Sequence, residues 1–315
     1  MNILITGGAG YIGTSLTKRL LDEGLGVTVF DNLNTGQREL VDKRAQFVLG
    51  DVLDCVGLEK VCVSNHFDSV IHLAALKSVR EGEQNPSEFV EKNVIGTLNV
   101  LETMKKNRIR SLIFSSSAAV YQENDIGIYD ENCPLSAKSI YGSTKIICEE
   151  LITQYERLGY FNQTIIFRYF NIAGDSGIKF FDKHAQNLFP VLARANLENK
   201  PFSIFGNDYN TPDGTAIRDY IHLSDLTEAH VLCLKNKSSG VFNLGTERGT
   251  SVKEIVNKFN KHCPQPLVIE EIERKIGDAE KAVANSTKAK LQFGWAAQFS
   301  LEDMINSTIE TYNAK

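Results

Sequence analysis

The chain has 315 residues, enough for one large or two modest domains, and its 42% hydrophobic and 23% charged residues are ordinary for a globular protein. The formal net charge of −5, without a long basic run, argues against nucleic acid as the main partner, although a few placed Arg and Lys could still bind a small anion. No apolar run approaches the roughly 20 residues of a membrane span, no signal peptide precedes the first predicted strand, and six scattered cysteines without a histidine cluster predict no metal site, so we expect a cytoplasmic protein.

The chain begins with an apolar, β-branched stretch at residues 2–6 that predicts a buried strand, and glycines follow it at once. Residues 11–23 then have helical spacing. Between the two, Gly7, Gly10 and Gly13 match a dinucleotide-binding fingerprint. Glycines there let a pyrophosphate approach the helix N-terminus, where free N–H groups and the helix dipole bind it.

A second predicted strand, residues 26–30, ends in Asp31, about 20 residues past the glycines. A carboxylate at this point binds the ribose hydroxyls of the adenosine and repels a 2′-phosphate, so we expect NAD and not NADP. The alternative is an aspartate that caps the loop before Asn32. It explains less, because strand, glycines, helix, strand and acid come in the order that such a site requires.

Residues 32–43 are polar and predict a loop with a short helix, and residues 45–48 predict the next strand. Asp51 follows that strand closely. It could reach the amino group of an adenine, or it could be an ordinary turn aspartate. The spacing leaves both interpretations open.

Residues 68–73 predict another strand, and small residues, Ala74 and Ala75, follow it. Small side chains there leave room for a cofactor against the backbone. His72 lies inside the strand, so we interpret it as a packed core histidine. Residues 85–104 predict one long helix.

The next predicted strand, residues 110–115, runs into three serines. Strands that alternate with helices predict right-handed crossover units and a parallel, doubly wound α/β sheet of the Rossmann type. Ligands of such sheets bind where the strands end. The glycines, Asp31, Asp51, the alanines and the serines all fall at that edge.

Tyr141 and Lys145 are four residues apart at the start of a helical pattern that continues over 146–158, so they share a helix face. A free phenol titrates near 10, and a neighbouring ammonium stabilises the phenolate. This pair can therefore supply a base near neutral pH. A Tyr-x-x-x-Lys spacing is common by chance, but here a strand-end serine precedes it in a nucleotide-binding chain.

A series of motifs spreads over nearly the whole chain: TGGAGYIG (6–13), DNL (31–33), HLAALKSV (72–79), NVIGTLNVLE (93–102), FSSSAAVY (114–121), YGSTK (141–145), RYFNIAG (168–174), FGNDYNTPDGTAIRDYIHLSDL (205–226), FNLG (242–245) and RKIGD (274–278). In these motifs the chain resembles the extended short-chain dehydrogenase/reductase superfamily and, more narrowly, the UDP-glucose (UDP-galactose) 4-epimerases. The early motifs are typical of the superfamily, and the long block at 205–226 is the specific one.

The resemblance implies a catalytic group of Ser117, Tyr141 and Lys145, in which serine and tyrosine contact the sugar 4-hydroxyl and lysine tunes the tyrosine. It also implies that NAD is bound by Gly7, Gly10, Tyr11, Ile12, Gly13, Asp31, Asn32, Asp51, Val52, Ala74, Ala75, Lys77, Asn93, Ser115, Tyr141, Lys145 and Tyr169.

The nucleotide-sugar site that the resemblance implies consists of Lys77, Ser117, Tyr141, Asn171, Asn187, Leu188, Phe205, Arg218, Lys275, Asp278 and Ala282. In this site Arg218 would bind the diphosphate, a bidentate task that suits guanidinium. The alternative for Arg218 is a structural pair with Asp219 or Asp225.

Three positions depart from the family pattern. Gln122 stands where a glycine is usual, and Ala119 stands where a hydroxyl residue is common beside the sugar. Lys275 replaces the second arginine of the last motif, which keeps the charge but loses the fork that binds a diphosphate through two hydrogen bonds.

We expect two domains: an NAD-binding domain of residues 1–171 with about 216–240, and a smaller, discontinuous α+β domain of 172–215 and 241–315 for the nucleotide sugar. In the second half of the chain, helices are predicted at 187–198, 226–234, 251–262 and 301–312, and extended segments at 201–205 and 219–223. The segments 219–223 and 226–234 are expected to return to the first domain.

The predicted function is the NAD-dependent C4 epimerisation of a UDP-hexose, in which hydride leaves C4 and returns to the opposite face of a 4-keto sugar. One alternative is an epimerase of another nucleotide sugar, such as an N-acetylated, uronic acid or pentose substrate. Another is a non-catalytic NAD-sensing protein, which would usually lack the tyrosine or lysine. The resemblance also implies a homodimer that packs through the helices at 85–104 and 141–158.

The resemblance places a specificity residue, next to the C2 substituent of the sugar, four positions after Asp278. A count without gaps gives Ala282. Its small side chain predicts room for an acetamido group, and so activity on UDP-GlcNAc and UDP-GalNAc. The alternative is that the local alignment slips by one or two positions and Ala282 is a plain strand residue.

Overall fold

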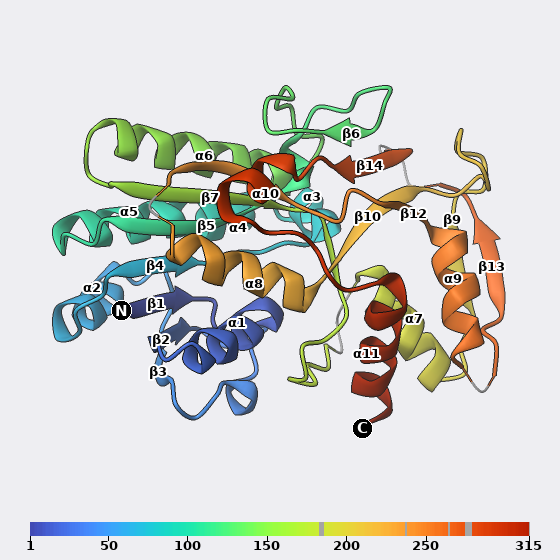
Figure 1. Ribbon diagram of the computed structural model, residues 1–315, viewed down its shortest axis with the longest axis horizontal. Coiled ribbons are helices and arrows are strands. Elements are labelled where there is room, and N and C mark those ends of the chain that lie inside the picture. Colours follow the sequence, from blue (N-terminus) through green and yellow to red (C-terminus); the bar gives the residue numbers. More distant parts are fainter. Residues whose placement is uncertain (183–185, 237, 264, 275–278, 315) are drawn as a thin grey trace.

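Seven parallel strands form the central sheet in the computed structural model, which describes residues 1–315 apart from 183–185, 237, 264, 275–278 and 315 (Figure 1). Across the sheet the order is β11 (Gly240–Leu244), β7 (Gln163–Tyr169), β5 (Ser111–Ser117), β4 (Ser69–His72), β1 (Asn2–Thr6), β2 (Gly26–Asp31) and β3 (Gln46–Leu49). Each neighbouring pair is parallel. The predicted doubly wound α/β fold is confirmed.

The central strands are apolar on both faces because helices cover both. In β1, Ile3 and Ile5 pack into one hydrophobic cluster, whereas Leu4, between them, packs into a second cluster on the opposite face. This division follows from the two-residue side-chain period of a strand. It also explains why the strand has a continuous apolar sequence and not an alternating one.

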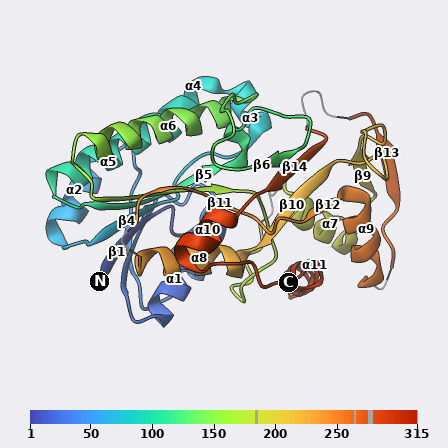
Figure 2. The same cartoon turned by 45° about the horizontal axis from the view of Figure 1, so that its top comes forward.

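Helices cover the two faces in groups (Figure 2). One group consists of α1 (Tyr11–Asp22), α8 (Leu223–Leu234) and α10 (Thr287–Phe293), and the other of α2 (Cys55–Ser64), α5 (Gly96–Lys106) and α6 (Ile140–Arg157). Among the residues that the structure describes, no helix has the length and apolar character that crossing a membrane requires.

The prediction of one uninterrupted helix over 85–104 is wrong. Two short helices, α3 (Val79–Gln84) and α4 (Pro86–Phe89), precede a π-helical segment, η2 (Val90–Ile95), and only then does α5 begin. Asn93, within the π-helical turns, is buried and its side chain binds the backbone of the loop after β4. Such widened turns often lie at functional sites, where they aim one side chain inward.

A second lobe lies beyond the edge where the seven strands end, on the right of Figure 1. Its larger sheet contains β6 (Ile128–Tyr129), β8 (Asn171–Ala173), β10 (Ile217–His222), β12 (Gly249–Ser251) and β14 (Lys281–Ala284). A two-stranded parallel sheet of β9 (Phe202–Phe205) and β13 (Ile269–Ile272) and three helices, α7 (Leu188–Leu197), α9 (Val252–Lys261) and α11 (Leu301–Asn313), complete it. A third hydrophobic cluster joins these helices.

Strand β6, within the predicted first domain, pairs in the sheet of the second lobe, and two longer strands also depart from the expected domain boundaries. Strand β10 belongs to the second lobe's sheet, although α8 after it packs against α1 as expected. Strand β11, assigned to the second domain from the sequence, is the edge strand of the seven-stranded sheet. None of these departures follows from local sequence, because pairing is a long-range property; the domain division itself stays a prediction.

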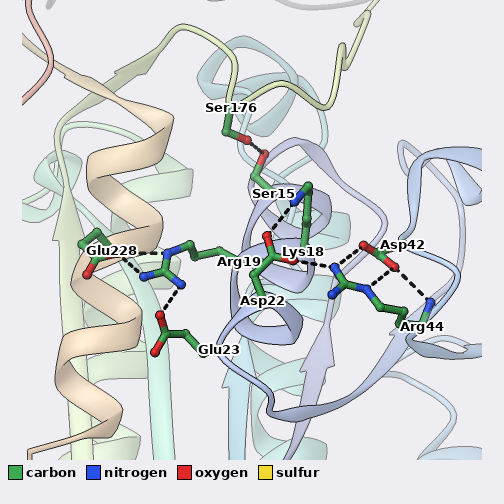
Figure 3. Close-up of polar contacts among 9 residues, drawn as sticks. All are labelled: Ser15, Lys18, Arg19, Asp22, Glu23, Asp42, Arg44, Ser176 and Glu228. Carbon is green, nitrogen blue, oxygen red and sulfur yellow. Dashed lines mark hydrogen bonds and ion pairs between the residues drawn. The ribbon is translucent and has the colours of Figure 1, made fainter.

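The outward face of α1 holds several exposed or half-exposed ion pairs (Figure 3). Arg19 binds Glu23 one turn later and Glu228 of α8, with 2.8 Å between the Arg19 terminal nitrogen and a Glu228 oxygen. Ser15, on the buried side, accepts a hydrogen bond from Ser176 of the second lobe at 2.7 Å. Helix α1 is therefore tied to α8 and to the second lobe.

Candidate active site

The loop between β1 and α1 passes so close to β4 that side chains do not fit. Gly7 has φ of 76°, and a Cβ on it would lie 2.6 Å from the Ala74 nitrogen. A Cβ on Gly13 would lie 2.3 Å from the Gly7 carbonyl oxygen. Gly10 precedes α1 and offers no side-chain cap, so no cap side chain occupies the N–H groups of the first turn. This cradle fits the pyrophosphate of a dinucleotide.

Asp31 ends β2 beside that loop, and its carboxylate is buried. One oxygen accepts a hydrogen bond from the Ala9 N–H at 2.9 Å, and the other accepts from the Leu33 N–H at 2.8 Å. The aspartate thus caps the loop, as its alternative interpretation held, and it also binds the glycine-rich loop. Its role toward a ribose stays a prediction.

Asp51 lies next to Asn32, across the ends of β2 and β3. Asn32 donates a hydrogen bond to one Asp51 oxygen at 2.8 Å, the Lys92 ammonium lies 3.2 Å from the same oxygen, and the Leu53 N–H binds the other at 2.9 Å. Val52 between them is buried. The structure thus brings Asp31, Asn32, Asp51 and Val52 to one corner of the sheet, where an adenosine would lie.

Asn93 links the loop after β4 to the start of α6. Its side-chain oxygen accepts from the Leu76 N–H at 2.8 Å, and its nitrogen donates to the Leu76 carbonyl and to the Thr144 hydroxyl, both at 3.0 Å. The loop that contains Ala74 and Ala75 is thereby fixed against the helix that bears Tyr141.

His72 is a packed core histidine, as predicted. Its ring nitrogens bind the hydroxyls of Thr6 at 2.6 Å and Thr97 at 2.9 Å, and burial lowers its pKa to about 3. The imidazole is therefore neutral at physiological pH and is not a base for catalysis.

Helix α6 begins at Ile140, where Ser139 caps it by accepting a hydrogen bond from the Gly142 N–H. This start places Tyr141 in the first turn and Lys145 one turn later, both facing the end of β5. The Lys145 ammonium donates to the Ser115 carbonyl at 2.7 Å and lies 5.9 Å from the Tyr141 ring centroid. Ser117 ends the same strand and hydrogen-bonds Tyr141. The predicted catalytic group is thus assembled in one place.

Burial decides the protonation of this pair. Burial lowers the pKa of Lys145 to about 8, so the side chain remains mostly an ammonium at neutral pH. Burial raises the pKa of the Tyr141 phenol, and the hydrogen bond with Ser117 opposes that rise. The expected lowering of the Tyr141 pKa is therefore absent from this structure, because removal of the phenolate from water outweighs its neighbours.

Ser115 and Tyr169 lie at the ends of neighbouring strands on the opposite face of the sheet from α6. The Tyr169 hydroxyl hydrogen-bonds His230 of α8 at 2.8 Å and the Ser115 side chain, and burial raises the tyrosine's pKa above its usual range. Both residues are buried at this edge, and their contact with a cofactor stays a prediction.

Several of the predicted nucleotide-sugar residues come from the second lobe, whereas Lys77, Ser117 and Tyr141 belong to the first. Asn171 begins β8, Asn187 precedes Leu188 at the start of α7, and Phe205 ends β9. Asn171, Asn187 and Phe205 are exposed. Lys275 and Asp278 lie outside the described residues.

Arg218 lies on β10 directly beside Ala282 on β14. The Asp219 carboxylate accepts hydrogen bonds from Thr246, Glu247 and Ala284, and that of Asp225 accepts from Gln298 and Phe299. Both carboxylates of the alternative interpretation thus have other donors. Ala282 and Ala118, the residue after Ser117, both pack against the same hydrophobic cluster.

A cavity lies between the start of α1 and the second lobe. Three predicted site residues, Tyr11, Lys77 and Asn187, line it together. Its further lining includes Asp175, Phe180 and Tyr312. Sequence analysis missed these three, and no local pattern marks them, because they come from the loop after β8 and from α11, which packs against β8 and α7.

Sequence analysis also missed Glu149, four residues after Lys145 on the same helix face. It is buried and forms an ion pair with Arg168 of β7. The helical spacing from Tyr141 through Lys145 places it on that face, but its burial and its partner depend on Arg168 of a distant strand.

Comparison with known proteins agrees with this geometry. Residues 3–245 match the model of the NAD dependent epimerase/dehydratase family. The chain belongs to this family. It is 39% identical over 303 residues to a UDP-glucose 4-epimerase of Corynebacterium glutamicum, a match that covers 95% of this chain and 91% of that relative.

Solved structures of the family superimpose on nearly the whole chain. A crystal structure of UDP-glucose 4-epimerase has a TM-score of 0.96 and 37% identity, with 100% of this chain and 98% of that one covered. A UDP-glucose 4-epimerase of Bifidobacterium longum in complex with NAD+ and UDP has a TM-score of 0.92 and 32% identity, with 100% and 99% covered. The predicted family resemblance is confirmed.

Proposed function

We propose that this chain interconverts UDP-glucose and UDP-galactose by epimerisation at C4, with NAD as a retained cofactor. The observation that carries the proposal is the meeting of Tyr141, Lys145 and Ser117 at the end of β5, at the same edge as the glycine cradle. The names of the relatives, UDP-glucose 4-epimerases, supply the substrate. Tyr141 and Lys145 are both present, which disfavours a non-catalytic NAD-sensing protein.

The residues present fit NAD. The glycine cradle would hold the pyrophosphate, and Asp31, Asn32, Asp51 and Val52 lie together where the adenosine would be. When bound, NAD supplies the acceptor and donor of the hydride at sugar C4. The protein's task is to orient the sugar and to move the proton of its 4-hydroxyl.

Tyr141 is the proposed base for that proton, and Ser117 orients the hydroxyl. Because burial raises the pKa of Tyr141, its phenolate needs a nearby positive charge, and the Lys145 ammonium is a charge that the chain itself offers. General-base catalysis of this kind contributes roughly 10²–10⁴-fold to a rate.

The direct test is to incubate the purified protein with UDP-glucose and other UDP-sugars and to assay for the C4 epimer, and to denature it and analyse the released nucleotide. We expect UDP-galactose from UDP-glucose, and NAD in the released fraction. Turnover confined to a uronic acid or pentose sugar would favour the alternative substrates. Release of mainly NADP would contradict the role of Asp31.

Ala282 is the proposed specificity residue beside the C2 substituent. The support is its position next to Arg218 and in the cluster with Ala118. We expect activity on UDP-GlcNAc as well. Ala282→Tyr should lower kcat/KM for the acetamido sugars far more than for UDP-glucose and UDP-galactose, because a steric clash inside a closed pocket has a large energetic cost. Equal losses for both pairs of sugars would mean that Ala282 is a plain strand residue and that the specificity position lies one or two residues away.

We also propose a cytoplasmic homodimer formed through α6 and the α4–α5 region. These elements pack side by side, and their exposed apolar side chains, Val90, Ile95 and Ile147, support such a contact. Ile147→Asp should convert a dimer to a monomer in light scattering; a monomeric wild type would refute it.

A further inference from the structure

Helix α6 contacts three consecutive residues at the end of β5 through side chains spaced four residues apart. The pairs are Ser115 with Lys145, Ser116 with Glu149, and Ser117 with Tyr141. A helix brings residues at this spacing to one face. The proposed catalytic side chains are therefore two members of a row whose third member is Glu149.

Glu149 is joined to the sheet by more than one bond. Arg168 Nε lies 3.0 Å from one carboxylate oxygen and an Arg168 terminal nitrogen lies 2.6 Å from the other, a bidentate pair. The two residues are 5% and 3% exposed. The Ser116 hydroxyl donates to the same carboxylate, and Ser116 and Arg168 are direct partners across β5 and β7.

Arg168 also donates to groups other than Glu149. Its other terminal nitrogen donates to the Tyr121 hydroxyl at 3.1 Å, and Tyr121 donates to Asn243 of β11 at 2.6 Å. Asn243 is the partner of Arg168 across β7 and β11. The network thus spans three strands and fixes the carboxylate in one position.

A buried ion pair of this kind is poor evidence for stability, because desolvation of the two charges offsets most of their attraction. An apolar pair of similar volume would pack as well. A satisfied polar network instead specifies one arrangement of the elements it joins. Here those elements are the helix and the strand that carry Tyr141, Lys145 and Ser117.

We propose that Glu149, bound to Ser116 and Arg168, is a positioning residue that fixes α6 on the end of β5 and so sets the placement and charge of Tyr141 and Lys145. The effect of this residue on catalysis rests on the proposed epimerase function. Its effect on Lys145 does not depend on which reaction the protein catalyses.

The electrostatic part follows from the groups around the Lys145 ammonium. These are His72 on β4, Tyr141, Cys148 and Glu149 on α6, and Arg168 on β7 behind Glu149. Burial lowers the pKa of His72 and raises those of Tyr141 and Cys148, so these three are neutral at pH 7. Burial has the largest effect on the pKa of Lys145 and lowers it, whereas Cys148 and then Glu149 raise it. Without Glu149, Lys145 should lose its proton at lower pH.

The test compares Glu149→Gln with Glu228→Gln in the protein as purified. Glu228 is the matched control, because it also binds an arginine of another element, Arg19, but on the surface. The first readout is the titration midpoint of Lys145, by NMR of lysine isotope-labelled at Cε and assigned by its loss in Lys145→Met. We expect Glu149→Gln to lower the midpoint by about one pH unit and Glu228→Gln to leave it unchanged.

The second readout is epimerase kinetics. Glu149→Gln should lower kcat about 10- to 100-fold with little change in KM, since misplacement of about 1 Å has that effect. The alkaline limb of its pH–rate profile should move to lower pH. If wild-type protein epimerises nothing, the proposed function fails, but the Lys145 midpoint still decides this inference.

A double variant separates positioning from stability. Glu149→Met with Arg168→Met leaves no unpaired buried charge, so its melting temperature should recover relative to either single change. We expect the Lys145 midpoint and kcat to remain altered. If the double variant restores both, or if Glu149→Gln lowers only the melting temperature, the pair is merely structural and the inference is overturned.

Discussion

Helices α1 and α6 both begin at the edge where the strands of the central sheet end, on opposite faces of it, but they carry their charges in opposite ways. Helix α1 places Lys18, Arg19 and Asp22 toward solvent (Figure 3). Helix α6 turns Lys145 and Glu149 into the protein. Exposed pairs contribute little free energy, whereas these two buried charges have fixed partners, and burial lowers the pKa of Lys145.

The difference shows how each helix could serve catalysis. Helix α1 contributes its backbone, because glycines clear the space at its start and its side chains there carry no charge. Helix α6 contributes side chains, and each of Tyr141, Lys145 and Glu149 has a partner on β5. Variants in the two helices should therefore fail in different ways.

The largest effect is expected for Tyr141→Phe, which removes the proposed base from α6. Turnover should fall roughly 10²–10⁴-fold, while nucleotide-sugar binding, measured by calorimetry, should change little. Ser117→Ala should cost less, since it removes only an orienting hydrogen bond. A near-normal kcat in Tyr141→Phe would remove this residue from the mechanism.

Gly13→Ala tests the backbone role of α1. The added Cβ overlaps the Gly7 carbonyl oxygen. Relieving such a steric clash costs about 1–3 kcal/mol, so the NAD recovered after purification should fall about tenfold or more. Gly24→Ala, just past the other end of the helix, is the control for strain away from the cradle, because its φ of 78° strains an alanine although a Cβ there meets no atom within 4 Å. Equal NAD content in both variants would contradict the cradle.

Lys145→Met tests the buried ammonium of α6 through pH. The rising limb of the pH–rate profile should move to higher pH, because the phenolate of Tyr141 loses its neighbouring charge. An unmoved limb, with only weaker NAD binding, would mean that Lys145 serves the cofactor alone.

The same variant has a signature in stability. Because the pKa of Lys145 is lowered to about 8 from 10.5, the unfolded chain binds more protons than the folded one between these values, so this group makes the wild type more stable as pH rises through that window. The free energy of unfolding of wild type minus that of Lys145→Met should increase by up to about 3 kcal/mol from pH 8 to 10.5. A flat difference in urea unfolding would contradict the burial of the ammonium.

The smallest effect is expected for Glu228→Gln on the surface of α8. Loss of its pair with Arg19 should change the free energy of unfolding by about 1 kcal/mol or less, with epimerase activity unchanged. The effect should shrink further at high salt. A loss of several kcal/mol would mean that this exposed pair contributes as much free energy as a buried one.

Features that depend on neighbouring residues could be predicted from the sequence. The strand at residues 2–6, the glycines and Asp31 follow one another within a single βαβ unit, so their order predicted the fold and the cofactor edge. The pairing of Tyr141 with Lys145 is predictable because helical spacing alone places them on one face. The role of His72 as a packed core histidine is predictable because it lies inside a buried strand.

Tertiary structure alone decided what depends on distant residues. The pairing of β10 and β11 places these strands in sheets that their local sequence does not specify, because their partner strands are distant along the chain. In the π-helical turns, Asn93 bonds the loop after β4, and this long-range bond has no trace in the helical pattern. Glu149 reads as an ordinary polar residue of a helix; only the register that places Arg168 beside Ser116 buries it and gives it a partner, since a long-range contact fixes both its burial and its charge.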